Sequence, residues 1–171
     1  MSEKEAKELT PEEEAEKNQK EIAVRRRKLA DLQDGGRDPF RITTCPRDTT
    51  AQEVRDRFAE LESKDVCVAG RIMSWRDMGK ASFMDLYDRS GRIQVYMKID
   101  QVGEDSYREV KSCWDVGDII SVKGYVFKTR RGEVSVHARE IRLLAKSLLP
   151  LPEKFHGLKD TDLRYRQRYL D

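Results

Sequence analysis

The sequence has 171 residues, a formal net charge of +2, and a composition in which 39% of residues are charged and 37% hydrophobic. This length suits one domain of typical size with extensions, and no run approaches the roughly 18 apolar residues of a membrane-spanning helix. The three cysteines (Cys45, Cys67 and Cys113) are too far apart for a disulfide framework or a Cys-x-x-Cys metal site, and only two histidines accompany them. We therefore expect a cytoplasmic protein without a signal peptide, membrane segment or metal site.

The first 62 residues predict a charged tail followed by a helical extension. Residues 1–20 are mostly Glu, Lys and Ala with little to bury, so we expect a disordered tail or a frayed helix. Thr10-Pro11 nevertheless gives a helix start signal, and apolar residues then recur every seven positions until Gly35-Gly36 ends the helix. A capping box, Thr50-Ala51-Gln52-Glu53, begins a second, short helix. We assign residues 21–62 to the helical extension.

A basic run, Arg25-Arg26-Arg27-Lys28, lies near the end of the first predicted helix. Cations are favoured there because the carboxyl end of a helix carries partial negative charge. The run is interpreted as a solvated helix end, with contact to nucleic acid as the alternative.

From Val66 onward the apolar residues alternate with a period of two, which is typical of β-strands. Turn signals divide this region into five strands, and residues 104–114 predict a short helix between the third and the fourth. That order predicts an OB-fold, a five-stranded barrel that binds oligonucleotides across its second and third strands. An SH3-like barrel is the rival, but it lacks the helix. The predicted fold class is therefore mainly β with a helical N-terminal extension, and the barrel is assigned to residues 63–146.

Strand register predicts which side chains of the second and third strands face solvent, because successive residues point to opposite faces of a strand. The predicted interior positions are Met84, Leu86, Ile93, Val95, Met97 and Ile99. The predicted outward positions include Phe83, Arg92, Gln94, Tyr96 and Lys98. An exposed phenylalanine beside an exposed glutamine is informative, since a barrel normally hides the aromatic ring.

Phe83 and Gln94 together suit single-stranded RNA. Bases stack on aromatic planes, and an amide can bond the Watson–Crick edge of uracil. Arg71 and Arg76, from the end of the first strand, could reach phosphates or a base oxygen. Secondary contacts are expected from Lys80, Arg92 and Lys98. Packing of Phe83 under the N-terminal helix or a loop is the alternative.

Glu133 opens the fifth predicted strand after the turn Arg130-Arg131-Gly132. A carboxylate beside a nucleic-acid groove repels phosphate, so its presence needs a reason. It either accepts a hydrogen bond from a base or pairs locally with Arg130 or Arg131, and the pattern alone favours the local pair. No catalytic motif accompanies these residues: the sequence has no Gly-rich phosphate loop, His-Glu-x-x-His or Gly-x-Ser-x-Gly.

Several segments resemble the anticodon-binding domain of class II lysyl-tRNA synthetases. They are residues 68–73, 78–83, 91–96, 116–120, 129–137 and the closing segments 149–158 and 164–171. The general OB pattern is shared with the aspartyl and asparaginyl enzymes, and the closing segments favour the lysyl family. The resemblance covers roughly residues 21–171.

The resemblance implies a role for each candidate residue. Phe83 would stack on the central anticodon base, a uridine, and Gln94 and Arg76 would hydrogen-bond that uridine. Glu133 would read the first anticodon base, against the local pair that the pattern favours. Trp75 stands where the family often has a basic residue, so it either adds stacking surface or fills space.

The resemblance also implies that residues 147–171 are a linker toward a catalytic domain that would begin after Asp171. The parent enzyme would be a homodimeric, ATP- and magnesium-dependent lysine–tRNA ligase. This chain would hold its tRNA-reading part, with lysine tRNA as partner, no cofactor of its own and no activity alone. The alternatives are a general single-strand-binding OB module and a protein–protein interaction domain.

Overall fold

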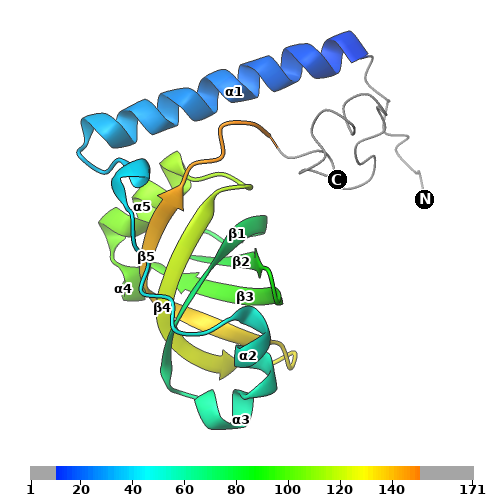
Figure 1. The fold of residues 1–171 in the computed structure, drawn as a ribbon, viewed down its shortest axis with the longest axis vertical. Helices are drawn as coiled ribbons and strands as arrows, with labels where there is room; N and C mark the ends of the chain where they lie inside the picture. Colours follow the sequence, from blue (N-terminus) through cyan, green and yellow to red (C-terminus); the bar gives the residue numbers. More distant parts are fainter. Residues whose placement is uncertain (1–10, 151–171) are drawn as a thin grey trace.

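The computed structural model describes residues 11–150. Five strands form a closed barrel in the order β1-β2-β3-β5-β4, with parallel pairing only between β3 and β5 (Figure 1). The strands are β1 (Asp65–Asp77), β2 (Ala81–Asp88), β3 (Gly91–Lys98), β4 (Ile119–Lys128) and β5 (Val134–Ala145). Two helices, α4 (Ile99–Val102) and α5 (Glu104–Cys113), lie between β3 and β4. The predicted OB-fold is therefore confirmed.

The interior of the barrel follows the predicted register. Met84 and Leu86 on β2 are each 1% exposed, and the inward residues of β3 are Ile93, Val95 and Met97. Ile99 was expected to continue that interior row of β3, but the strand ends at Lys98 and Ile99 begins α4. Tyr107 and Val110 of α5, and Trp114 directly after it, join the same core.

The connector to the barrel contains a 3-10 turn, η1 (Pro39–Arg41), followed by α2 (Ala51–Asp56) and α3 (Phe58–Leu61). The predicted capping box is present, because the Thr50 side chain accepts from the Glu53 backbone N–H and the Glu53 carboxylate accepts from the Thr50 N–H at 2.7 Å. Hydrogen bonds that the Glu53 carboxylate accepts, first from the Thr50 hydroxyl and then from the Thr50 backbone N–H, hold its pKa below the ordinary value. Helix α2 packs on β3 and places Val54 in the core.

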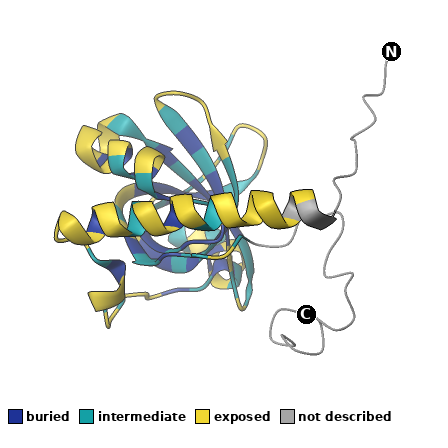
Figure 2. Ribbon diagram, turned by 90° about the horizontal axis from the view of Figure 1, so that it is seen from above, coloured by how far each residue is buried: buried dark blue, intermediate teal, exposed yellow. Residues whose placement is uncertain are grey.

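Helix α1 (Pro11–Asp34) lies across the opposite end of the barrel from α2 and α3, and it packs on α5 (Figure 1). It begins at the predicted proline, so residues 11–20 are helical where the composition indicated a disordered tail or a frayed helix. Residues 1–10, and the predicted linker from residue 151 onward, lie outside the described residues. Most of α1 is exposed (Figure 2), and Leu32 is its fully buried apolar residue.

The basic run of α1 is divided between structural contacts and solvent. Arg26 and Arg27 are exposed. Arg25 is only 5% exposed and donates to the carbonyl oxygens of Ser147 at 3.0 Å and Val116 at 3.1 Å. The interpretation of the whole run as a solvated helix end was therefore wrong for Arg25, and also for Lys28, which donates to Asp115 Oδ1.

An ionic junction joins α1, the loop before β4 and the segment after β5. It consists of Lys28, Asp115, Asp118 and Lys146. The Lys146 ammonium group donates to Asp115 Oδ2 at 2.5 Å and to Asp118 Oδ2 at 2.8 Å, and Lys28 donates to Asp115 Oδ1 at 2.6 Å. The side chains of Lys146 and Asp118 are fully buried. These contacts fix the path of the chain as it leaves the barrel.

Candidate nucleic-acid interface

The strand register arranges outward side chains in rows that cross the barrel. One row contains Arg76, Phe83, Tyr96, His137 and Tyr125, from β1, β2, β3, β5 and β4 respectively. The next row contains Ser74, Asp85, Gln94, Ser135 and Phe127. We call Arg76, Phe83, Gln94, Tyr96 and Glu133 the outer face. Four of these five residues are predicted site residues, and the pairing of the strands brings them onto one side of the barrel.

Arg76 faces outward because β1 contains a β-bulge. Strict alternation after Ile72 would point Arg76 into the barrel, but the register shifts between Ile72 and Ser74. A bulge inserts one extra residue and so reverses which side chains face outward beyond it. As a result the Arg76 guanidinium lies 5.9 Å from the centre of the Phe83 ring. Sequence reasoning named Arg76 but not the bulge that places it.

The same bulge turns Trp75 inward. Trp75 is paired with Met84 across β1 and β2, and it is partly buried against the core. Of the two roles left open for Trp75, filling space is therefore the correct one.

Phe83 is half-buried on the barrel surface. Its ring packs against Tyr96 with 4.8 Å between ring centres and 36° between ring planes. The alternative that Phe83 packs under the N-terminal helix is not observed, since α1 packs on α5 instead. One side of the Phe83 ring is supported by the protein, which is what a stacking platform requires.

Gln94 has the predicted outward register but is only 9% exposed. The expectation of an exposed glutamine was wrong, because the parallel pairing of β3 and β5 places Ser135 next to it. The Gln94 Oε1 accepts a hydrogen bond from Ser135 Oγ at 3.0 Å. Its Nε2 donates to no described residue, so its donors remain available at the edge of the face.

Glu133 pairs with neither Arg130 nor Arg131. Its Oε1 instead accepts from Nη2 of Arg92, a residue on β3 that lies 41 positions earlier in the chain. The local pair favoured by the pattern was therefore wrong. Arg92 was expected to be a secondary contact for nucleic acid, but its guanidinium lies between two carboxylates, since Asp85 Oδ1 is 3.6 Å from its Nη1.

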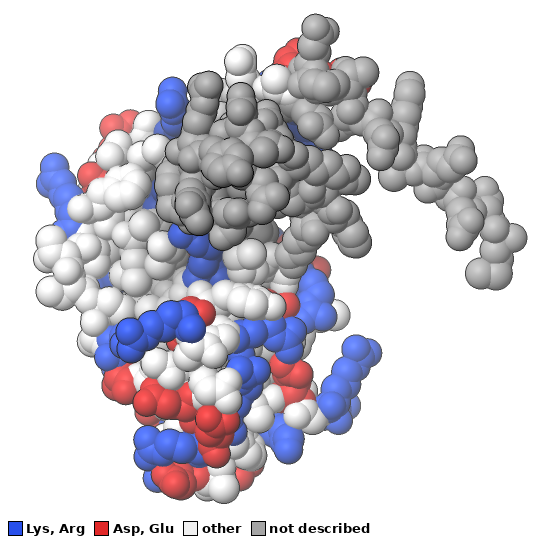
Figure 3. Space-filling model, turned by 45° about the vertical axis from the view of Figure 1, so that its right-hand side comes forward, with Lys and Arg blue, Asp and Glu red and all other residues white. Residues whose placement is uncertain are grey.

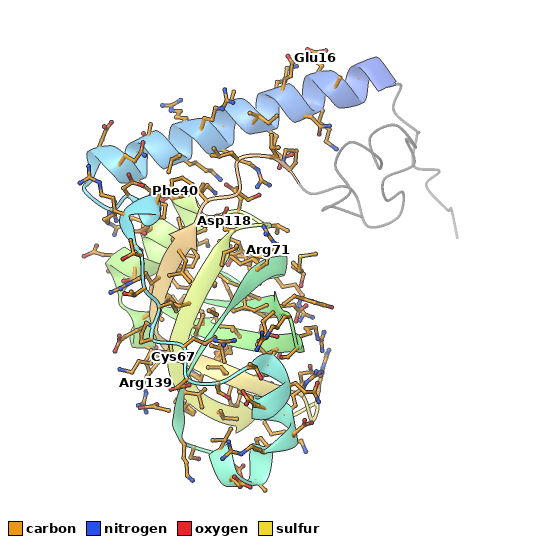
Figure 4. The ribbon with its side chains drawn as sticks, in the orientation of Figure 1. Glu16, Phe40, Cys67, Arg71, Asp118 and Arg139 are labelled. Carbon is orange, nitrogen blue, oxygen red and sulfur yellow. The ribbon has the colours of Figure 1, made fainter. Side chains whose placement is uncertain are left out.

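The other basic candidates have different surroundings. Arg71 donates to the carbonyl oxygen of Gly117 at 2.7 Å, next to Asp118 (Figure 4), and it pairs with Tyr87 rather than with Phe83 across β1 and β2. Lys98 forms an ion pair with Asp100 at 2.7 Å, and that partner raises the pKa of the Lys98 ammonium group. Lys80 and Arg76 are exposed and form no ion pair with any residue from 11 to 150. Figure 3 shows basic and acidic side chains interspersed on the face of the molecule that it presents, rather than one continuous basic patch.

Sequence reasoning missed an aromatic cluster that continues the row of Phe83 and Tyr96. The His137 ring lies 4.9 Å from Tyr96 and is stacked on Tyr125 at 4.8 Å, with Phe127 at 5.8 Å. His137 was expected to be a surface residue of its strand, but it is only 8% exposed, and this burial lowers its pKa. The period-two spacing of Tyr125 and Phe127 on one strand was the signal that could have indicated the cluster.

Within residues 11–150, no group of three His, Cys, Asp or Glu side chains could hold a metal ion. In the same part of the chain, no helix is both long and apolar enough to cross a membrane. The outer face offers ring planes, amide and guanidinium donors and one carboxylate, which are groups that bind bases rather than groups that activate a substrate.

Comparison with known proteins agrees with this geometry. Residues 66–144 match the family model of the OB-fold nucleic acid binding domain. The chain is 57% identical over 150 residues to a lysine–tRNA ligase of Clostridium tetani and 56% identical to one of Clostridium kluyveri. These matches cover 88% of this chain but only 30% of each relative. Residues 66–144 are therefore an OB-fold anticodon-binding domain, and most of the chain matches the N-terminal region of lysine–tRNA ligases.

Proposed function

We propose that the outer face binds the anticodon loop of lysine tRNA and reads its central uridine. The observation that carries this proposal is the placement of Arg76 beside Phe83, with Gln94 one row away on the same face. Phe83 provides the stacking plane, and stacking of one base on an aromatic ring contributes about 1–3 kcal/mol. The 57% identity to a lysine–tRNA ligase supports lysine tRNA as the partner.

Arg76 and Gln94 have complementary parts in this reading. The amide of Gln94 has an acceptor and two donors, so it could also turn to suit cytosine. Arg76 has donors only, and it therefore favours the carbonyl oxygen of uracil over the amino group of cytosine. The hydrogen bond from Ser135 Oγ to Gln94 Oε1 does not prevent that turning, because the hydroxyl could accept from Nε2 of a flipped amide, so the preference for uracil rests on Arg76.

The chain spans about a third of the length of the relatives it matches. We propose that it is the tRNA-reading part of a cytoplasmic lysine–tRNA ligase. Formation of the lysyl ester would then depend on parts of such an enzyme other than the described barrel, whose outer face has no phosphate loop or metal-binding group.

The test is a titration of the 171-residue chain with two anticodon stem-loop RNAs that have uridine or cytidine at the central position. The uridine loop should bind at least about tenfold more tightly, because a buried base edge left unpaired costs about 1–3 kcal/mol. Gln94→Ala and Arg76→Ala should each reduce this ratio. Arg108→Ala is the matched control, since Arg108 is an exposed arginine on α5 that pairs with Glu104.

Equal affinity of the wild type for the two loops would reject anticodon reading and favour a general single-strand-binding module. Absence of binding to either RNA would favour a protein–protein interaction domain instead.

A further inference from the structure

A chain of polar contacts crosses the outer surface of the barrel and ends at Glu133. The Ser74 hydroxyl, just after the bulge of β1, donates to Asp85 Oδ2 on β2. The other oxygen of Asp85 lies 3.6 Å from Arg92 Nη1 on β3, and Arg92 Nη2 donates to Glu133 Oε1 next to β5. Four side chains from four separate segments are thus connected in one line.

Arg92 is the centre of this chain. Its planar guanidinium presents several donors in a fixed arrangement, so it can bind two carboxylates on different sides at once. The Asp85 side chain is only 14% exposed, whereas Glu133 is 41% exposed. The more buried carboxylate therefore anchors Arg92, and Arg92 in turn holds the more exposed carboxylate.

Glu133 needs such support because it follows a turn. Gly132 has a φ of 85°, and the Thr129 backbone N–H donates to the Glu133 carbonyl oxygen at 2.9 Å, which closes the turn. A glutamate side chain in this exposed position would otherwise sample several rotamers, and ordering them on binding would weaken the interaction. Arg92 also offsets the negative charge that Glu133 would present to RNA phosphates.

One oxygen of Glu133 remains available. Oε1 is bonded to Arg92, while Oε2 accepts no hydrogen bond from residues 11–150. A carboxylate with one oxygen fixed and the other open is prepared to accept an N–H from a base.

We propose that Arg92 is a positioning residue that orients Glu133 toward the first anticodon base, rather than a contact for RNA phosphate. This proposal rests on the proposed function of the outer face. It predicts that Arg92 affects discrimination at the first anticodon position and leaves discrimination at the central position unchanged.

The test uses anticodon stem-loop RNAs that carry either uridine or 3-methyluridine at the first anticodon position. The N3-methyl group removes the N–H that Glu133 would accept. The wild-type chain should prefer the uridine RNA by about tenfold or more, the range expected for a hydrogen bond to a charged group. Arg92→Met should bring this ratio close to one, and combining it with Glu133→Ala should reduce the ratio no further.

Arg92→Lys and Lys98→Met are the companion variants. Arg92→Lys keeps the positive charge, so this variant should stay folded. A single ammonium group cannot bridge Asp85 and Glu133, however, so most of the preference for uridine over 3-methyluridine should still be lost. Lys98→Met removes a cation from the same strand and the same face, and it should leave the ratio unchanged. Thermal melting checks that each variant is folded.

Two outcomes would overturn the inference while leaving the proposed function intact. In the first, Arg92→Met weakens all RNAs equally and lowers the log–log salt slope by about 0.7, as loss of one phosphate contact does. In the second, the wild type distinguishes bases at the central position but not at the first. Failure to distinguish bases at either position would instead reject the proposed function itself.

Discussion

The ionic junction and the outer face contain the same kinds of side chain but use them differently. In the junction, Lys146 and Asp118 are fully buried and directly bonded to each other. On the outer face, Arg76 is exposed, and its guanidinium lies over the ring of Phe83, which begins the row of aromatic side chains. The comparison shows that the partners available to a charged residue, rather than its type, determine whether it supports the fold or is free to bind a ligand.

Arg71 and Arg25 show how easily the two uses are confused. Both are arginines for which the sequence allows a contact with RNA, and both donate to backbone carbonyl groups at the α1 end of the barrel. Basic residues are therefore reliable candidates for RNA contacts only after their internal partners are known.

The largest expected effect is the loss of the ionic junction in Lys146→Met. The substitution leaves the carboxylates of Asp115 and Asp118 without their shared cation, and removing one partner of a buried ion pair costs about 3–5 kcal/mol. Urea unfolding followed by circular dichroism measures the change. Lys123→Met is the control, because the Lys123–Glu140 pair is exposed and should contribute about 0–1 kcal/mol. Equal effects of the two variants would mean that the buried junction stabilises the fold no more than an exposed ion pair does.

Adjacent residues of β2 provide the next test, since Met84 faces the core and Phe83 the outer face. Met84→Ala should lower the free energy of unfolding by about 2–5 kcal/mol, because it leaves a cavity. Phe83→Ala should leave the fold intact and weaken binding of the anticodon loop by about 1–3 kcal/mol through lost stacking. If Phe83→Ala unfolds the protein as severely as Met84→Ala does, Phe83 belongs to the core and not to a binding face.

Much of the fold was predictable from the sequence because local patterns specify it. The alternation of β2 and β3 predicts both the interior row and the outward Phe83, and the capping box predicts the start of α2. The short helix predicted at residues 104–114 agrees with α5 (Glu104–Cys113) to one residue.

The detailed site was less predictable because it depends on contacts between distant segments. The bulge at residues 72–74 has no glycine to indicate it, yet it decides the direction of Arg76. The pairing of β3 with β5 covers Gln94 with Ser135 and brings Arg92 to Glu133. No local pattern specifies contacts between residues 41 positions apart.

Salt dependence provides a smaller and more graded test of the same comparison. Arg71, Arg92 and Lys98 already have internal partners, so the exposed basic residues without an ion pair to residues 11–150, on the outer face or close to it in sequence, are Arg76, Lys80, Arg130 and Arg131. With about 0.7 per phosphate contact on single strands, the log–log slope of affinity against salt should be about -3. A slope near -5 would mean that the internally paired residues also contact phosphate, and a flat response would argue against RNA as the partner.

The smallest expected effect concerns His137, a buried ionisable group without the ionic partners that Lys146 has. Burial lowers the pKa of His137 below its ordinary value of 6.5, and the nearby cations Arg139 and Lys98 act in the same direction. As the pH falls below about 6.5, His137 therefore becomes protonated in the unfolded chain while it is still neutral in the folded chain. The contribution of His137 to stability is present above that pH and is lost as the pH falls through the lowered pKa of the folded state.

His137→Phe separates this effect from the carboxyl groups, because it keeps a ring between Tyr96 and Tyr125 but cannot take up a proton. The carboxyl groups with lowered pKa values, such as Asp77 and Asp88, lose their contribution at lower pH, starting below their ordinary value of 3.8. Urea unfolding at pH 7.5 and 5.5 should show a loss of stability in the wild type that is reduced in His137→Phe. The same loss in both proteins would mean that His137 is accessible enough to be protonated in the folded state. The aromatic cluster around His137 would then be accessible to solvent as part of the outer face, rather than packed and closed to solvent.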